Sequence, residues 1–297
     1  MARNLMALVL QRHFARRVSR PAAHLGYLAA GGQLPRGGSG DPPRTRLSGV
    51  VVLGVVVGVL GLAVCALAEA PPAPADKGKP ANLDADPHLV GWWKFDDASG
   101  ATAADSSKNG RNGALRGGLT FDKDSAPGRL GKALKLDGKE GFVQIAGYKG
   151  VAGAAPRTVC AWIKTKAAGG EILSWGQRDF GKMWTFCFIR GRVGVTPKGG
   201  YLYMGAATND DAWHHVAAVV EEAGRPNLHD NVRLYKDGEP AKIDDIGLLD
   251  LWPIETGSEQ DVRIGWKFSG LLDDVRLYDR ALSEDEIAAL FRQGGGK

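Results

Sequence analysis

The chain has 297 residues, enough for one large domain or two ordinary ones, and its net charge is +5. Residues 1–70 hold eight Arg, no Lys and two acids, a net +6, so residues 71–297 carry −1. A near-neutral remainder excludes the domain-wide basic surface that is typical of nucleic-acid-binding proteins. All eight Trp lie beyond residue 90, so the packed core is predicted to begin there.

The N-terminal part of the chain predicts export. Residues 1–47 are rich in Arg, Gly and Pro and predict a disordered basic extension. Residues 48–68 are uncharged and long enough to span a bilayer, and the small residues at their end fit a signal-peptidase site. Residues 48–70 are therefore either a cleaved signal peptide or a retained anchor. A secreted, periplasmic or membrane-anchored protein is expected, with residues 71–297 outside the cytoplasm and membrane contact only through the span. Because a signal peptide is rarely preceded by so long a segment, one hypothesis places the true start downstream.

Residues 71–88 are rich in Pro, Ala and Lys and predict a linker. Beyond it, short apolar or alternating runs are separated by turn residues such as Asp137-Gly138 and Asp237-Gly238. The predicted strands are Leu89–Phe95, Ala133–Leu136, Phe142–Ile145, Thr158–Lys164, Glu171–Trp175, Trp184–Ile189, Arg192–Val195, Tyr201–Met204, Trp213–Val220, Val232–Lys236, Asp261–Ile264 and Leu272–Tyr278. So many strands without helices between them predict an all-β antiparallel sandwich or barrel.

One short C-terminal helix is predicted after the last strand. Ser283 and Glu286 form a capping box, in which each side chain bonds the backbone of the other. Ile287, Leu290 and Phe291 make a narrow apolar stripe that can dock on the sandwich. Residues 294–297 are then a flexible tail.

Cys160 and Cys187 are the cysteines that lie beyond the hydrophobic span. In an exported domain they form either a disulfide or two buried free thiols, and the sequence leaves both alternatives open.

The last predicted strand places a carboxylate in an apolar row. If side chains alternate, Asp273 shares a face with Val275 and Leu277, whereas Asp274 shares the other with Arg276. A buried carboxylate needs an Arg partner, a cluster of N–H donors or a cation, and the alternative is exposure at the strand end.

Residues 96–110 form a second polar segment, rich in carboxylate, hydroxyl and amide oxygens. Ca²⁺ takes six to eight oxygen ligands, which such a loop can supply, but ordinary Asx turns explain the same composition.

No catalytic motif is present in the sequence. The E-x-D-x-E pattern of sandwich glycosidases is absent, and so is the G-x-S-x-G turn of serine hydrolases. Among the aromatic residues, Trp252 and Trp266 lie near turns and are the best candidates for an exposed ligand-binding face.

An ordered set of short motifs resembles a known family. The set comprises Leu89–Asp96, Asp105–Gly110, Gly131–Gly138, Phe142–Val143, Thr158–Lys164, Trp213–Ala217, Leu234–Gly238 and Gly270–Leu282. In this order they resemble the LamG-like jellyroll domain of the concanavalin A-like lectin/glucanase fold. The resemblance covers residues 89–293 and implies a two-sheet antiparallel jellyroll sandwich with the one short C-terminal helix.

The resemblance also implies a structural Ca²⁺ site. Its ligands would be Asp105, Asn109 or Gly110, and Asp273, brought together by the neighbouring first and last strands. Lys108 stands where the family usually has Gly, and Leu272 where it usually has Ile.

The function expected from this resemblance is non-catalytic binding of a carbohydrate or another surface polymer, without nucleic acid. Two alternatives stay open: a glycoside hydrolase of the same fold, and a protein–protein adhesion module without sugar affinity.

Overall fold

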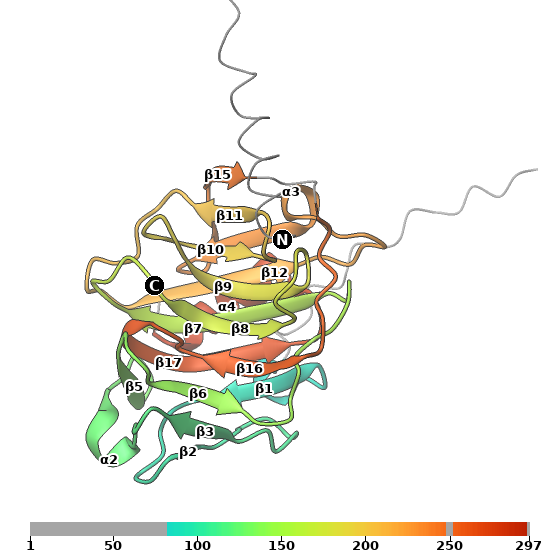
Figure 1. The fold of residues 1–297 in the computed structure, drawn as a ribbon. Coiled ribbons are helices and arrows are strands. Elements are labelled where there is room, and N and C mark those ends of the chain that lie inside the picture. The colour runs from blue at the N-terminus through green and yellow to red at the C-terminus, as the bar shows by residue number, and fades with distance from the viewer. Residues whose placement is uncertain (1–81, 248–251, 296–297) are drawn as a thin grey trace, which may run out of the picture. The chain divides into compact units, whose positions relative to one another are not determined.

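The computed structural model describes residues 82–247 and 252–295, which form a sandwich of two antiparallel sheets (Figure 1). The predicted N-terminal extension, the hydrophobic span and most of the predicted linker lie outside the described residues. Within the described residues, no helix is long and apolar enough to cross a membrane.

The strands of the described region divide between an eight-stranded and a nine-stranded sheet. The first sheet runs β14 (Glu239–Pro240), β13 (Val232–Lys236), β12 (His214–Val220), β7 (Arg157–Lys164), β17 (Ser269–Tyr278), β5 (Lys132–Asp137) and β4 (Ser125–Pro127), with β1 (Leu89–Trp93) also paired to β17. The second runs β15 (Ile243–Gly247), β11 (Tyr201–Met204), β10 (Arg192–Thr196), β9 (Met183–Ile189), β8 (Glu171–Gly176), β16 (Gln260–Ile264), β6 (Phe142–Ile145), β3 (Gly113–Arg116) and β2 (Thr102–Ala103). The predicted all-β architecture is confirmed.

The main hydrophobic core fills the space between the two sheets. Trp93, Trp175, Trp184 and Phe186 are fully buried there, together with aliphatic residues from both sheets. Because side chains alternate along a strand, the neighbours of these residues point to the outer faces. In β9, Trp184 and Phe186 face the core, whereas Thr185 between them faces outward.

A second, smaller core lies on the outer face of the eight-stranded sheet, beneath helix α4 (Glu284–Gln293). The predicted capping box is confirmed, because Ser283 accepts from the Glu286 backbone and Glu286 accepts from the Ser283 backbone. Ile287 and Leu290 of α4 are buried against this sheet face. Two further helices are single turns, α2 (Phe121–Asp124) and α3 (Leu228–Asn231).

The packed domain begins earlier than the sequence predicts. Residues 82–88 were expected to end the linker, but they contain the 3₁₀ turn η1 (Leu83–Ala85), and Leu83 is 1% exposed. Asp84 and Asp86 form ion pairs with arginines of the C-terminal segment, namely Arg276 and Arg280. These contacts explain why a polar, Pro-flanked stretch is ordered here.

A β-bulge in β17 overturns the predicted alternation of side chains. The pairing with β7 shifts register between Asp273 and Arg276, and Asp274 adopts a left-handed conformation with φ of 48°. Leu272, Val275 and Leu277 therefore face the main core. Simple alternation predicts that Asp273 shares this face. Instead, the extra residue of the bulge turns Asp273 toward the opposite side of the sheet.

The disulfide alternative is wrong, because Cys160 and Cys187 are free thiols in the structure. Cys160, in β7, belongs to the small core beneath α4. Cys187, in β9 of the other sheet, alternates with core-facing Phe186 and Phe188 and so points to that sheet's outer face. With the main core between them and their side chains directed apart, the two sulfur atoms cannot bond.

A fully buried arginine organises the loop that precedes β7. The Arg157 guanidinium donates to the carbonyls of Val151, Gly153 and Ala155 and to the hydroxyl of Thr256, at 2.7–3.0 Å. Burial lowers the pKa of this group to about 10. The carbonyl cage satisfies its donors and anchors the loop against the 252–257 segment.

Replacing this arginine should destabilise the domain strongly. Arg157→Met leaves several buried carbonyls without donors, so we expect the free energy of unfolding to fall by about 3 kcal/mol or more. The matched variant Arg233→Met, at an exposed position in β13, should cost about 0.5 kcal/mol or less. Denaturant unfolding measures both, and equal losses in the two variants would contradict this role for Arg157.

Candidate functional site

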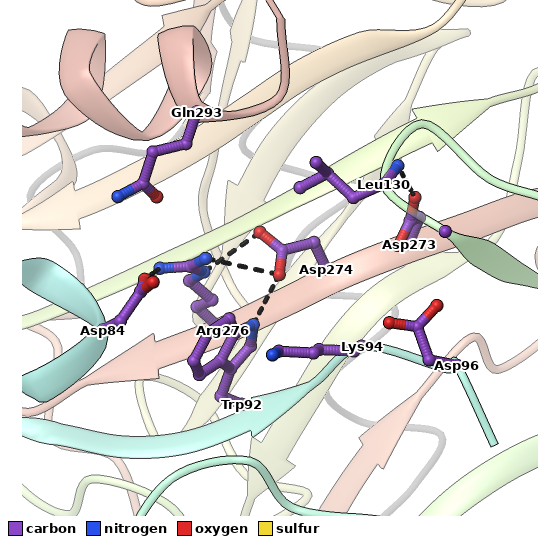
Figure 2. A pocket seen from close by; sticks show the side chains of 10 residues that line it. Asp84, Trp92, Lys94, Asp96, Leu130, Asp273, Asp274, Arg276 and Gln293 are labelled. Carbon is purple, nitrogen blue, oxygen red and sulfur yellow. Dashed lines mark hydrogen bonds and ion pairs between the residues drawn. The ribbon is translucent and has the colours of Figure 1, made fainter.

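An ion-pair network joins the two ends of the domain at the bulge (Figure 2). The Trp92 indole N–H donates to Asp274 Oδ1, and Arg276 Nε donates to Asp274 Oδ2 at 3.0 Å. Arg276 Nη1 also pairs with Asp84 at 2.6 Å. The Lys94 ammonium and the Arg276 guanidinium each lie 4.1 Å from the Trp92 ring centroid. Every charge in this network faces an opposite charge or an aromatic ring, which is typical of a structural role.

Asp273 is fully buried beside this network. Its Oδ2 accepts from the backbone N–H groups of Arg129 and Leu130 at 2.7 and 2.8 Å, whereas its Oδ1 has no hydrogen-bond partner. Burial, and secondarily the charges of Asp274 and Asp96, raise the pKa of Asp273 to about 7. The sequence left three ways to stabilise a buried carboxylate: an Arg partner, a cluster of N–H donors or a cation. The structure contains the N–H cluster, which donates to Oδ2 alone.

The oxygen-rich loop around Asp105 is satisfied by its own chain. Asp105 Oδ1 accepts from the backbone of Trp92 and Ser107, and its Oδ2 accepts from the Ser107 hydroxyl and the Arg111 backbone. Asn109 donates its amide to the Leu89 carbonyl at 3.0 Å. These hydrogen bonds are those of an Asx-type turn, which the sequence left open as the alternative to a Ca²⁺-binding loop.

The predicted calcium ligands do not line one common pocket. Asp273 lines a pocket of about 350 Å³ with Asp84, Asp96 and Asp274, and neither Asp105, Asn109 nor Gly110 lines it. Over the described ranges, no group of three or more His, Cys, Asp or Glu side chains is placed to hold a metal ion. Both Asp105 oxygens accept hydrogen bonds from the protein, whereas Oδ1 of Asp273 has no hydrogen-bond partner. The shared Ca²⁺ site therefore stays a prediction.

A larger groove, of about 640 Å³, lies on the outer face of the nine-stranded sheet. Its floor is made by outward-facing side chains of β9 and β10, among them Met183, Thr185, Cys187 and Thr196. Thr185 and Thr196 face each other across these strands, which run side by side in Figure 1. The Thr196 hydroxyl donates to the Gly200 carbonyl at 2.5 Å and accepts from the Lys198 N–H at 3.0 Å, so the hydroxyl that the floor offers to a ligand is that of Thr185.

Two turns that hydrogen-bond to each other close one end of the groove. In the β8–β9 turn, Gly181 donates its N–H to the carbonyl of Lys198 in the β10–β11 turn, at 2.8 Å. The Lys198 ammonium donates back to the Arg178 carbonyl at 2.5 Å. Phe180, which is 41% exposed, stacks on Trp252 with ring centroids 4.5 Å apart. These contacts make a cationic, aromatic wall from segments that are far apart in sequence.

Trp266 stands at the other end of the groove, in the β16–β17 turn. Its carbonyl accepts from the Glu171 N–H at 2.8 Å, and its ring packs edge-on against Phe142 at 5.0 Å. Glu171 is the one carboxylate among the residues that line the groove. It accepts from Arg263 at 3.0 Å and from the Ser174 hydroxyl at 2.5 Å, so its charge is already neutralised.

The two predicted ligand-binding tryptophans have different positions. Trp266 lines the groove, whereas Trp252 is half-buried and supports Phe180 at the adjoining wall. Sequence reasoning missed Thr185, Thr196 and Arg178. The outward alternation of β9 was the signal that could have found Thr185, but no motif links it to the turns.

A family model described as "Concanavalin A-like lectin/glucanases superfamily", Laminin_G_3, matches residues 137–288. The chain belongs to this superfamily. The match includes the groove strands β8–β10 and the bulged strand β17, so both sites lie on the family's fold. A comparison with curated proteins found no match.

Solved structures share this fold at low sequence identity. Domain 4 of AbnA, an extracellular arabinanase from Geobacillus stearothermophilus, is 19% identical, with a TM-score of 0.50, over 68% of this chain and 97% of that one. The binding domains of Paraclostridial Mosquitocidal Protein 1 and of botulinum neurotoxin serotype D are 16% and 14% identical, with TM-scores of 0.46 and 0.44. In both comparisons the match spans 69% of this chain. It covers about half of each binding domain's own chain, 52% and 51% respectively. At 19% identity, the likeness to domain 4 of AbnA shows the fold alone.

The buried carboxylate predicts a pH-dependent stability. Because the pKa of Asp273 is raised from 3.8 to about 7, its contribution is fully present below about pH 4 and is lost as the pH rises through 7. Asp273→Asn keeps an acceptor for the two backbone donors and removes the charge. We therefore expect its Tm, relative to that of the unaltered protein, to rise between pH 5 and pH 8. A difference that is constant with pH, or one equal to that of the exposed control Asp285→Asn, contradicts this account.

The same two proteins test the calcium hypothesis, which remains a prediction. An ion bound at the free Oδ1 of Asp273 would offset the cost of the buried charge. Added calcium should then raise the Tm of the unaltered protein at pH 8 and leave the Tm of Asp273→Asn unchanged. EGTA should reverse the rise in Tm. Identical melting curves in calcium and in EGTA would exclude the ion.

Proposed function

We propose that this domain is a non-catalytic carbohydrate-binding module whose ligand occupies the groove on the nine-stranded sheet. The observation that carries the proposal is the pairing of a half-exposed Trp266 with the Thr185 hydroxyl on the floor of one open groove. Sugars have apolar C–H faces that pack on aromatic rings and hydroxyl edges that need hydrogen bonds. The groove offers both kinds of surface within a single site.

The described carboxylates argue for binding rather than hydrolysis. A glycosidase of the two-carboxylate kind needs an acid and a second carboxylate about 5–9 Å apart. Glu171 is the single acid that lines the groove, and Arg263 and Ser174 already bond it. The groove lining therefore lacks the second carboxylate that this mechanism needs.

A neighbour of the same fold adds support. Domain 4 of AbnA is described in complex with arabinotriose, and this chain covers 97% of it. At 19% identity that likeness establishes the fold alone, so a sugar ligand for this chain rests on the groove residues.

We further propose that the domain works outside the cytoplasm. The uncharged stretch at residues 48–68, preceded by an Arg-rich segment, supports this placement. N-terminal sequencing of the mature protein tests it, and a chain that begins near Met1 would rule out cleavage.

Removal of the aromatic platform should abolish most of the binding. On a glycan array, the unaltered domain is expected to bind a defined set of glycans, and Trp266→Ala should weaken that binding at least tenfold, as expected for a central aromatic anchor. Trp213→Ala removes an equally large, half-buried ring outside the groove and should leave the affinity unchanged.

The array also separates the rival functions. Cleavage of a bound glycan would establish the hydrolase. Failure to bind any glycan, or equal losses in the two tryptophan variants, would remove the carbohydrate proposal and favour an adhesion module.

A further inference from the structure

Positive charge gathers along the groove in a domain that is otherwise near neutral. Arg178, Lys198 and Lys267 line the groove, against one acid, Glu171. The charge of Glu171 is balanced by Arg263 at 3.0 Å. Residues 71–297 carry a net −1, so this excess is local and does not reflect the composition.

At one end of the groove, a lysine is held in place beside an uncommitted arginine. The Lys198 ammonium donates to the Arg178 carbonyl and lies 5.5 Å from the Phe180 ring centroid. The exposed guanidinium of Arg178 makes no hydrogen bond or ion pair with any residue in the described parts of the chain. Its planar set of donors matches a carboxylate or a sulfate.

At the other end of the groove, cations flank the aromatic platform. Arg263 and the Lys267 ammonium each lie 5.2 Å from the Trp266 ring centroid. Lys267 also pairs with Glu140 at 2.6 Å, but both side chains are largely exposed, with 47% and 72% of their surface open to water. Such a surface pair contributes little and exchanges readily for a ligand anion.

From this arrangement we propose that the ligand is an acidic glycan, bearing uronate carboxylates or sulfate esters. One sugar ring packs on Trp266, and an anionic group further along the chain accepts hydrogen bonds from Arg178 and Lys198. The inference rests on the proposed function and deepens it. A neutral glycan would leave the two cations of the turn wall without an anionic partner, whereas an acidic peptide would lack the sugar ring face that packs on Trp266.

The test compares glycans that differ in charge alone. The purified domain is titrated calorimetrically with galacturonan oligosaccharides and with their fully methyl-esterified, neutral form. Dextran sulfate and dextran make the second pair, which separates sulfate from carboxylate recognition, and polyglutamate tests an acidic peptide. We expect at least one acidic member to bind about tenfold or more tightly than its neutral partner, with an affinity that falls as salt rises.

Variants then locate the anion contacts. Arg178→Ala and Lys198→Ala should each weaken the acidic ligand about tenfold, the usual effect of losing a hydrogen bond to a charged group. The affinity for a neutral glycan should not change in either variant. Arg225→Ala, which removes an exposed arginine outside the groove, is the matched control and should change neither affinity. Equal melting temperatures establish that these surface variants fold.

The outcomes distinguish this inference from the function that it extends. Equal affinity within both glycan pairs, or an Arg178→Ala variant that behaves like Arg225→Ala, overturns the acidic ligand and leaves sugar binding in place. Polyglutamate binding as tight as that of the acidic glycans also overturns it. If neither acidic nor neutral glycans bind, the carbohydrate function itself fails.

Discussion

The bulge in β17 is the constraint on which the domain's architecture depends. β17 pairs with β1, β5 and β7, so it joins the first strand to strands from the middle of the chain in one sheet. A left-handed Asp274 is strained by about 1 kcal/mol or more. Its carboxylate offsets that strain by bonding Trp92 and Arg276. The same bulge keeps Val275 in the main core and turns Asp273 away from it.

This arrangement gives the two outer sheet faces different tasks. On the eight-stranded sheet, α4 and η1 cover the outer face, where Leu83, Ile287 and Leu290 are buried. Asp84 of η1 also forms an ion pair with Arg276 of β17. The nine-stranded sheet presents hydroxyl and thiol groups outward and carries the groove. The face closed by the helix stabilises the fold, and the open face is the one that can receive a polymer.

Much of the fold could be predicted because its signals are local. The strand runs, the Asp237-Gly238 turn with positive φ at both residues, and the Ser283 capping box each depend on neighbours in sequence. The short strands β2, β3, β4, β14 and β15 were missed because long-range pairing, rather than an alternating pattern, makes them strands. Strict alternation misplaced Asp273, since one bulged residue reverses the register.

The sites were harder to predict than the fold. Trp266 was found because a tryptophan near a turn is a recognisable exception to burial. Arg178 and Lys198 were missed because they lie on separate turns that only the packing of two hairpins brings together. The Asp105 loop has the composition of a cation site, but its oxygens accept from the backbone and hydroxyl donors around them. Composition alone cannot distinguish these two uses of the same oxygens.

The central claim is that ligand binds on the open sheet face and leaves the bulge undisturbed. Two indole N–H groups report on these places in one NMR spectrum: Trp266 at the groove and Trp92 on Asp274. During titration with a glycan that binds, the Trp266 indole resonance should shift saturably while the Trp92 resonance stays fixed. A saturable shift of Trp92 with Trp266 unmoved would place the ligand at the bulge and contradict the account.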